Sequence, residues 1–411
     1  MKTPMLRFKA DDGSEFPAWE EKTLGEITGL FVGKSFTSEL NKNGCYVVMD
    51  MGSVSPDGSI IDAKLTDLDR DMLRRGDLIM PKDDIGGGLI IGKTAYIPCD
   101  DKYVCGDHVY RLRFDSEIDG LFMHYEINSS GPQRRLGRKV TGSAQLGLNS
   151  KSVSSETVSV PFLPEQRKIA DFLSAVDDVI AAQQAEVDAW EQRKKGVMQK
   201  LFSQEVRFKA DDGSEFPAWE EKTLGEEGRF YGGLSGKDKK DFDCGTARFL
   251  TYMNVYKNTF ASRDAMGYVE VGDAEKQNKV RYGDILFTQS SETVDEVGLS
   301  SVYLYDDEPY LNSFCMGYRF NNLANVCPEF IGYCMRSNGI RKSIMLMGQG
   351  ISRINLGKKR LATVKYKIPS LPEQRKIADC LASMDEVIQK SKDELAKWQE
   401  LKKGLLQQMF V

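Results

Sequence analysis

The chain has 411 residues, of which 41% are hydrophobic and 28% are charged, and this composition is typical of a globular protein with two or three domains. It has no apolar run of about 18 residues and no N-terminal apolar segment of the secretory type, so we expect a cytoplasmic chain without a membrane span. The formal net charge of −5 argues mildly against a nucleic-acid partner, and two histidines with eight scattered cysteines argue against a metal site.

The sequence is an internal repeat of two units. Residues 7–26 and 207–226 are identical over twenty positions, at an offset of 200. Residues 163–171 and 371–379 both read LPEQRKIAD, at an offset of 208. The segments between the matched blocks diverge strongly. We therefore expect one fold that occurs twice and carries two different surfaces.

The divergent segments, residues 27–162 and 227–370, are predicted to be mixed α/β domains. Residues 120–129 and 328–337 have aliphatic and aromatic side chains at helical spacing, which predicts a helix in each domain. Short apolar runs bounded by turn residues predict strands at Tyr46–Met49, Asp77–Met80, Gly88–Ile91, Val109–Leu112 and Ile285–Thr288.

Residues 87–94 match the phosphate-binding pattern G-x-x-x-x-G-K-[ST]. That pattern binds nucleotides only between a strand and a helix. Here its interior reads as a strand, and the residues that follow are also strand-like. The second unit lacks the Gly-Lys-Thr. We therefore expect no nucleotide hydrolysis through Lys93, and since no other catalytic constellation is present, we expect no catalytic residue in the chain.

Charge is distributed unevenly along each domain. No acidic residue occurs between Glu126 and Glu156, or between Glu329 and Glu373, and both windows are rich in Lys, Arg, Gly, Ser, Asn and Gln. Such side chains contact phosphates and base edges. A solvated loop with chance composition is the alternative, and the recurrence of the window at the 208 offset argues against it.

Glycine-rich turns early in each domain add further candidates, although plain turn residues are the alternative there. The candidate DNA-binding residues are Lys34, Ser35, Arg134, Arg135, Arg138, Lys139, Ser143, Gln145, Lys237, Arg341, Lys342, Gln349, Arg353, Lys358 and Lys359.

After each LPEQ block, apolar residues recur at alternating spacings of three and four over about forty residues, the pattern of a coiled coil. Polar residues interrupt the two seams at matching places, Gln183 with Ser391 and Lys194 with Lys402. We expect an antiparallel intramolecular pair, and the alternative is two helices packed separately on their own domains. The predicted seam residues are Ile169, Leu173, Val176, Ile180, Val187, Trp190, Ile377, Leu381, Met384, Ile388, Leu395 and Trp398.

These features together resemble the specificity subunit of type I restriction–modification systems over essentially the whole chain. The resemblance is carried by residues 19–26 and their copy 219–226, by the Gly-Asp-aliphatic turns at Gly76 and Gly283, and by LPEQRKIADFL and LPEQRKIADCL with their long helices. It implies an α+β fold with two target recognition domains and an antiparallel coiled coil. The implied limits are 1–162 and 204–370 for the recognition domains and 163–203 and 371–411 for the helices.

The resemblance also implies a non-catalytic subunit. Each recognition domain would read one half of a bipartite site in double-stranded DNA, while the helices set the spacing and dock two methyltransferase subunits. S-adenosylmethionine, and ATP with Mg on any restriction subunits, would be bound by partners and not by this chain. A coiled-coil scaffold without a DNA role and a nucleotide-driven enzyme are the alternatives. The abrupt twenty-residue identity further suggests that recognition domains are exchanged by recombination.

Overall fold

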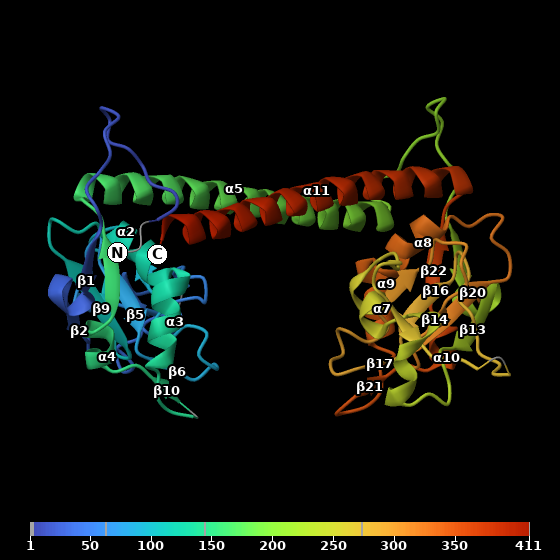
Figure 1. Cartoon of the computed structure of the whole chain (residues 1–411). Coiled ribbons are helices and arrows are strands. Elements are labelled where there is room, and N and C mark those ends of the chain that lie inside the picture. The colour runs from blue at the N-terminus through green and yellow to red at the C-terminus, as the bar shows by residue number, and fades with distance from the viewer. Residues whose placement is uncertain (1–3, 62–63, 144, 273, 411) are drawn as a thin grey trace. The chain divides into compact units, whose positions relative to one another are not determined.

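The computed structural model describes residues 4–61, 64–143, 145–272 and 274–410 (Figure 1). It divides into two compact units. Unit 1 contains Met1–Gln184 and Asp393–Val411, and unit 2 contains Ala185–Lys392. Each unit therefore combines one mixed domain with a segment from both long helices. No helix in the described ranges is long and apolar enough to cross a membrane.

The domain of unit 1 is built on two main sheets. A four-stranded sheet has the order β2-β9-β5-β7, and a three-stranded sheet has the order β4-β3-β8. Two small antiparallel pairs, β1-β11 and β6-β10, complete it. The strands are β1 (Glu20–Thr23), β2 (Thr28–Phe31), β3 (Tyr46–Met49), β4 (Lys64–Thr66), β5 (Leu78–Pro81), β6 (Asp83–Asp84), β7 (Ala95–Tyr96), β8 (Tyr103–Cys105), β9 (Val109–Phe114), β10 (Leu146–Gly147) and β11 (Thr157–Val160). The helices are α1 (Leu24–Ile27), the 3-10 turn η1 (Met51–Ser53), α2 (Gly120–Asn128), α3 (Ser130–Arg138) and α4 (Ser150–Ser154).

The domain of unit 2 repeats this sheet topology strand by strand. Its four-stranded sheet has the order β13-β20-β16-β18, its three-stranded sheet β15-β14-β19, and its small pairs are β12-β22 and β17-β21. The strands are β12 (Glu220–Thr223), β13 (Gly228–Gly232), β14 (Phe242–Leu250), β15 (Met266–Val269), β16 (Ile285–Thr288), β17 (Ser290–Ser291), β18 (Ser300–Val302), β19 (Tyr310–Leu311), β20 (Cys315–Phe320), β21 (Ile354–Asn355) and β22 (Lys365–Ile368). The helices are α6 (Leu224–Glu227), η2 (Lys239–Asp241), α7 (Tyr252–Lys257), α8 (Pro328–Met335), α9 (Asn338–Met345) and α10 (Lys358–Leu361).

One predicted strand is wrong. Residues 88–91 form bends and a turn, in which the backbone N–H of Ile90 donates to the Asp84 carboxylate at 3.1 Å and that of Lys93 to the Ile90 carbonyl at 3.0 Å. Gly87 and Gly88 have φ values of +86° and +88°, which a regular strand excludes. The phosphate-loop-like segment is followed by strand β7 and not by a helix.

The repeated Gly-Asp turns have a structural role. Gly76 has a φ of +92°, a conformation that glycine adopts without steric cost. The next residue, Asp77, is buried, and its carboxylate accepts hydrogen bonds from the Arg74 backbone at 2.8 Å and from Arg113 at 2.7 and 2.6 Å. Gly283 and Asp284 form the same turn, in which Arg319 and the Arg281 backbone are the donors. The ion pair between the buried aspartate and the partly buried arginine connects this turn to strand β9 in unit 1 and to strand β20 in unit 2.

The long helices are α5 (Leu163–Phe202) and α11 (Leu371–Met409). Within unit 1, Ile169 and Leu173 of α5 share a core with Met409 and Phe410, while Asp177, further along α5, pairs with Lys402. The two segments therefore run antiparallel there, as predicted. In unit 2, Leu201 packs in one core with Ile377 and Leu381, and Lys194 pairs with Asp385, which gives the same orientation.

The LPEQ motif ties each α5 or α11 start to its domain. The Glu165 carboxylate is fully buried and accepts hydrogen bonds from Arg7 at 2.9 and 2.7 Å and from Trp19 at 3.2 Å. The Gln166 amide donates to the carbonyl of Pro161 at 2.8 Å. In unit 2, Arg207 pairs with Glu373 and Gln374 donates to the Pro369 carbonyl in the same way, whereas the buried indole nitrogen of Trp219 has no hydrogen-bond partner among the described residues. The identical sequence blocks thus attach the segment that contains Arg7 or Arg207 to the start of a long helix.

Two seam lysines are neutralised inside their own units. Lys402 pairs with Asp177 at 2.5 Å, and Tyr125 donates a 2.7 Å hydrogen bond to the same carboxylate. In unit 2, Lys194, Asp385 and Tyr333 form the same network at 2.5 and 2.8 Å. Each network connects α5, α11 and the domain, so the two lysine interruptions of the heptad pattern have specific partners.

Candidate nucleic-acid interface

The two acid-free windows fold into equivalent elements. In unit 1 the window forms α3, the turn before β10, and α4. In unit 2 it forms α9, the turn before β21, and α10. The structure therefore brings the candidate residues of the first window into one helix and one hairpin, and those of the second into α9, one hairpin and α10.

Each window contains a hairpin in which one glycine has a positive φ. We call residues 141–147 and 349–355 the glycine hairpins. In the first, the Thr141 and Gly147 backbones exchange hydrogen bonds of 2.9 and 2.7 Å, and Gly142 has a φ of +104°. In the second, Gln349 and Asn355 exchange bonds of 3.0 and 2.7 Å, and the glycine has a φ of +129°. Residue 144 lies outside the described residues.

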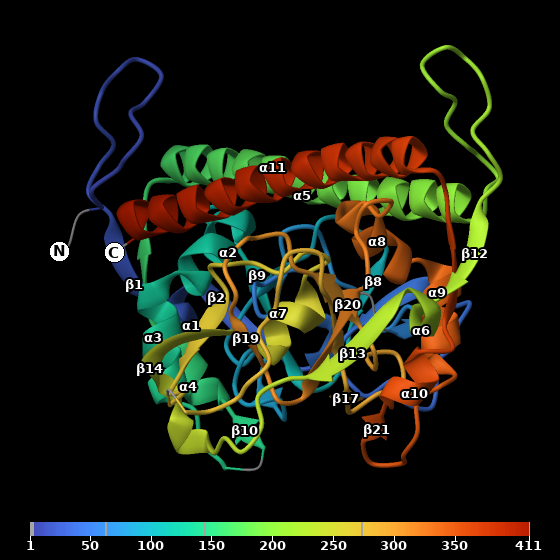
Figure 2. The ribbon, with the colours of Figure 1, turned by 90° about the vertical axis from the view of Figure 1, so that its right-hand side faces the viewer.

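Close packing inside each turn requires the glycine. A Cβ on Gly142 would lie 2.1 Å from the carbonyl oxygen of Gln145. A Cβ on Gly350 would lie 1.9 Å from that of Arg353. The two hairpins therefore share one backbone design although their side chains differ. In each unit, the hairpin lies at the end of the domain opposite the long-helix segments (Figures 1 and 2).

The glycine hairpins expose different side chains. In unit 1, Ser143 and Gln145 are exposed. In unit 2, Gln349, Arg353 and the apolar Ile351 are exposed, and the isoleucine side chain is fully accessible. Charge and motif reasoning missed Ile351. The sequence feature that could have identified it is an isolated aliphatic residue in a polar, glycine-rich segment.

Of the basic residues on α3, only some are free for a ligand. Arg135 and Lys139 bind the two oxygens of the buried Glu156 carboxylate at 2.6 and 2.8 Å, so they serve as its counter-ions. Arg134 and Arg138 are exposed and make no ion pair or hydrogen bond to the described part of the chain.

The same division holds in unit 2. Arg341 donates to two backbone carbonyls at 2.9 Å, and burial lowers its pKa. Lys237 pairs with Glu275 at 2.6 Å, which holds the pKa of that carboxyl at about 2. Lys342, Lys358 and Lys359 are exposed and have no counter-ion within the described ranges.

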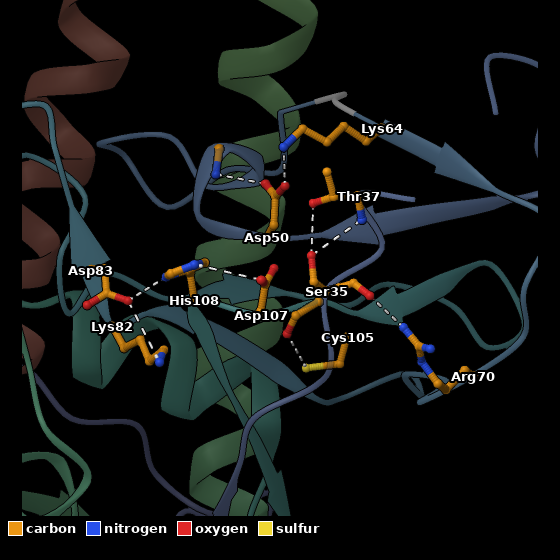
Figure 3. Close-up of polar contacts among 12 residues, drawn as sticks. Ser35, Thr37, Asp50, Lys64, Arg70, Lys82, Asp83, Cys105, Asp107 and His108 are labelled. Carbon is orange, nitrogen blue, oxygen red and sulfur yellow. Dashed lines mark hydrogen bonds and ion pairs between the residues drawn. The ribbon is translucent and has the colours of Figure 1, made fainter. Parts of the chain in front are cut away.

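Lys34 and Ser35 follow β2 in a loop, and Figure 3 shows Ser35 packed among its neighbours. Arg70 donates to the Ser35 carbonyl at 2.7 Å, while the Ser35 and Thr37 hydroxyls are 2.9 Å apart. The Lys34 side chain is exposed.

This loop is linked to the first glycine hairpin. A Cβ on Gly33 would lie 1.9 Å from the Cys105 carbonyl, and His108, three residues later, is 2.7 Å from Asp83 of β6. Asp83 pairs with Gly147 at the base of the hairpin. Figure 3 also shows that Asp50, Asp83 and Asp107 lie near this loop, so its surface is less basic than the window itself.

The described residues contain no group of three or more His, Cys, Asp or Glu side chains placed to hold a metal ion. The arrangement in each unit instead consists of an exposed polar hairpin and a helix with free cations. Such elements suit contact with base edges and phosphates.

Comparison with known proteins identifies one family. Residues 18–189 and 218–397, more than half of the chain, match the family described as "Type I restriction modification DNA specificity domain". The putative type I restriction enzyme MjaX specificity subunit of Methanocaldococcus jannaschii is 24% identical over 432 residues, which cover 97% of this chain and 94% of that protein. The MjaVIII specificity subunit of the same organism is 23% identical over 295 residues, which cover 70% and 69%.

Two solved structures share the fold. The type I restriction-modification system S subunit from M. genitalium has a TM-score of 0.60 at 17% identity and covers 100% of this chain and 99% of that one. A structure from work on complex assembly and conformational transition of the type I R-M system has a TM-score of 0.58 at 17% identity and covers 96% and 98%.

Proposed function

Because this chain belongs to the type I restriction–modification specificity subunits, the non-catalytic DNA-specificity part of those enzymes, we propose that each of its two domains reads one half of a bipartite site in double-stranded DNA. The observation that carries this proposal is the pair of glycine hairpins. They have one backbone design, occupy equivalent places in the two units and expose different side chains.

A two-stranded ribbon fits the major groove of B-DNA, where amide and guanidinium groups recognise base edges. Gln145 and Gln349 can each donate to and accept from adenine, and Arg353 can donate to guanine. Ile351 offers an apolar contact for a thymine methyl group. Because the two hairpins differ, the two half-sites are expected to differ as well. Lys34, Lys342, Lys358 and Lys359 would contact phosphates beside the bases.

The helices would set the distance between the half-sites. We propose recognition domains at 1–162 and 204–370, with the helical segments 163–203 and 371–411 as a rod and as the docking surface for two methyltransferase subunits. The identical LPEQRKIAD blocks support a docking surface that occurs twice. S-adenosylmethionine on the methyltransferases, and ATP with Mg on restriction subunits, would supply the chemistry. Action on cellular DNA places this complex in the cytoplasm of a bacterium or archaeon.

Methylation mapping tests the proposal. The full chain is co-expressed with its methyltransferase subunit, and methylated adenines are mapped by single-molecule sequencing with and without the chain. A bipartite motif that requires the chain is expected. If methylation shows no motif that depends on the chain, the DNA-specificity proposal fails.

Arg353→Ala tests the hairpin itself. Loss of one bidentate base contact costs about 1–3 kcal/mol of discrimination, so one position in one half-site should become relaxed. Lys257→Ala is the matched control, since Lys257 is exposed but lies outside the acid-free window. An unchanged second half-site in Arg353→Ala would argue that base readout lies elsewhere.

A further inference from the structure

A pocket lies at the N-terminus of α3 in unit 1. It has a volume of about 660 Å³ and is lined by Ser129, Ser130 and Gly131 at the helix start and by Arg134 and Arg138 along the helix. Ser130, Arg134 and Arg138 follow at spacings of four residues, so they share one face of α3. The pocket is thus a basic recess at the positive end of a helix dipole.

The helix start has unused hydrogen-bond capacity. The backbone N–H groups of Ser130 and Gly131 donate to no acceptor in the described part of the chain. Pro132 occupies the third helical position and has no N–H, so the N-cap residue Ser129 could cap only the N–H of Gly131, and its side chain makes no capping bond. Ser129 is only 5% exposed, and its buried Oγ has no hydrogen-bond partner. An unpartnered buried hydroxyl requires an explanation, and a ligand in the pocket provides one.

The walls of the pocket favour an anion. Arg134 and Arg138 have no counter-ion within the described ranges, and Glu21 is the one acidic residue among the lining side chains. Trp19 and Phe410 form an apolar wall, with ring centroids 6.4 Å apart. Apolar walls reduce screening by water and so strengthen the attraction between the arginines and an anion.

Unit 2 has a counterpart at the 208 offset. A pocket of about 510 Å³ is lined by Ser337, Asn338 and Gly339 at the start of α9. The N-cap Ser337 is 6% exposed and makes no side-chain capping bond. Trp219 and Phe202 again form the apolar wall. The helix start and the apolar wall therefore recur in unit 2, whereas the residues 208 positions after Arg134 and Arg138, Lys342 and Leu346, do not line this second pocket.

We propose that the pocket at the α3 N-terminus binds a phosphate group of the DNA backbone. This inference rests on the proposed function, because it assigns DNA as the source of the phosphate. Helix N-termini bind phosphate through free N–H groups and the helix dipole, and arginine adds planar, charge-assisted donors. In unit 1, the phosphate would fix the domain on the duplex while the glycine hairpin reads the bases.

The test uses the full chain in complex with its methyltransferase subunits. In Arg134→Gln/Arg138→Gln, the slope of log affinity against log salt for a duplex carrying the site should become shallower by about 1 to 2, and the methylated motif should stay the same. Lys151→Gln is the control, because Lys151 is exposed in the same window but does not line the pocket. Its effect on the slope should be smaller.

A second measurement follows inorganic phosphate by isothermal titration calorimetry. The wild-type complex should bind phosphate, and Ser129→Ala, which breaks no hydrogen bond, should bind it less tightly without a loss of thermal stability. If the double variant keeps the wild-type salt slope, the DNA assignment is overturned, even where inorganic phosphate binds. If it instead loses its methyltransferase subunits, the pocket serves a protein partner and the proposal is also overturned. A wild-type complex without a bipartite motif would refute the proposed function itself.

Discussion

Replacing Gly350 with alanine tests the second glycine hairpin through its backbone alone. The φ of Gly350 is +129°, and a Cβ there would lie 1.9 Å from the Arg353 carbonyl oxygen. A non-glycine residue in such a region costs about 1–3 kcal/mol. The clash adds to this cost, because a backbone carbonyl cannot rotate away as a side chain can. At about 3 kcal/mol, the original turn would remain in roughly one molecule in a hundred, since 1.4 kcal/mol is a tenfold change.

The assay is methylation mapping of the complex together with thermal unfolding. We expect the second half-site to be lost or relaxed, the first half-site to be retained in any residual motif, and the unfolding temperature to change little, because the hairpin is exposed. Gly357→Ala is the control: a Cβ at this glycine meets no atom within 4 Å. If Gly350→Ala methylates the wild-type motif at the wild-type rate, the hairpin does not read DNA.

Three further predictions concern stability and spacing. Arg7→Ala or Arg207→Ala leaves the buried carboxylate of Glu165 or Glu373 without its ion-pair partner, so each should lower the free energy of unfolding by about 3–5 kcal/mol in urea titrations. A loss below about 1 kcal/mol would contradict a stabilising role for this ion pair. Burial raises the pKa of Glu126 to about 7, so the folded state binds an extra proton between about pH 4.5 and 7 and loses stability as the pH rises through that range. Glu126→Gln should remove this slope and stabilise the protein by about 3 kcal/mol at pH 8, as measured by denaturation at pH 5 and 8, whereas an unchanged slope would contradict the assignment. Inserting one heptad in the middle of both α5 and α11 should lengthen the rod by about 10 Å and widen the gap between half-sites by about three base pairs, and an unchanged spacer in the methylated motif would argue against the rod.

Much of the fold could be predicted because it is periodic or repeated. The matched blocks predicted two units, the heptad pattern predicted two long paired helices, and the two-fold repeat predicted their antiparallel orientation. The strand predicted at Gly88–Ile91 failed because hydrophobicity alone does not reveal backbone dihedrals, and two glycines with positive φ fold the segment into bends.

The candidate site was predicted less completely. Composition identified the basic windows, but it could not distinguish free cations from internal counter-ions. Arg135 and Lys139 neutralise Glu156, which borders the window in sequence and is buried in space. Only the fold shows that Arg134, one residue earlier, faces a pocket. The glycine hairpins did leave a sequence signal, since Gly142 and Gly350 are separated by the same 208 residues as the LPEQ blocks.

Unit 1 is assembled from two distant stretches of chain, and this affects how it is made. The Leu6 backbone donates a 3.0 Å hydrogen bond to Gln408, and Phe410 packs against Trp19 and Phe122. These contacts can form only after Gln408 and Phe410 have been translated, and both residues follow the whole of unit 2 in the chain. At about 5–20 residues per second, the delay is of the order of 10–40 s. During that interval, Trp19 and Phe122 of the nascent first domain are not covered by Phe410 and are accessible to chaperones. A nonsense mutation near codon 400 would therefore damage the domain that was synthesised first.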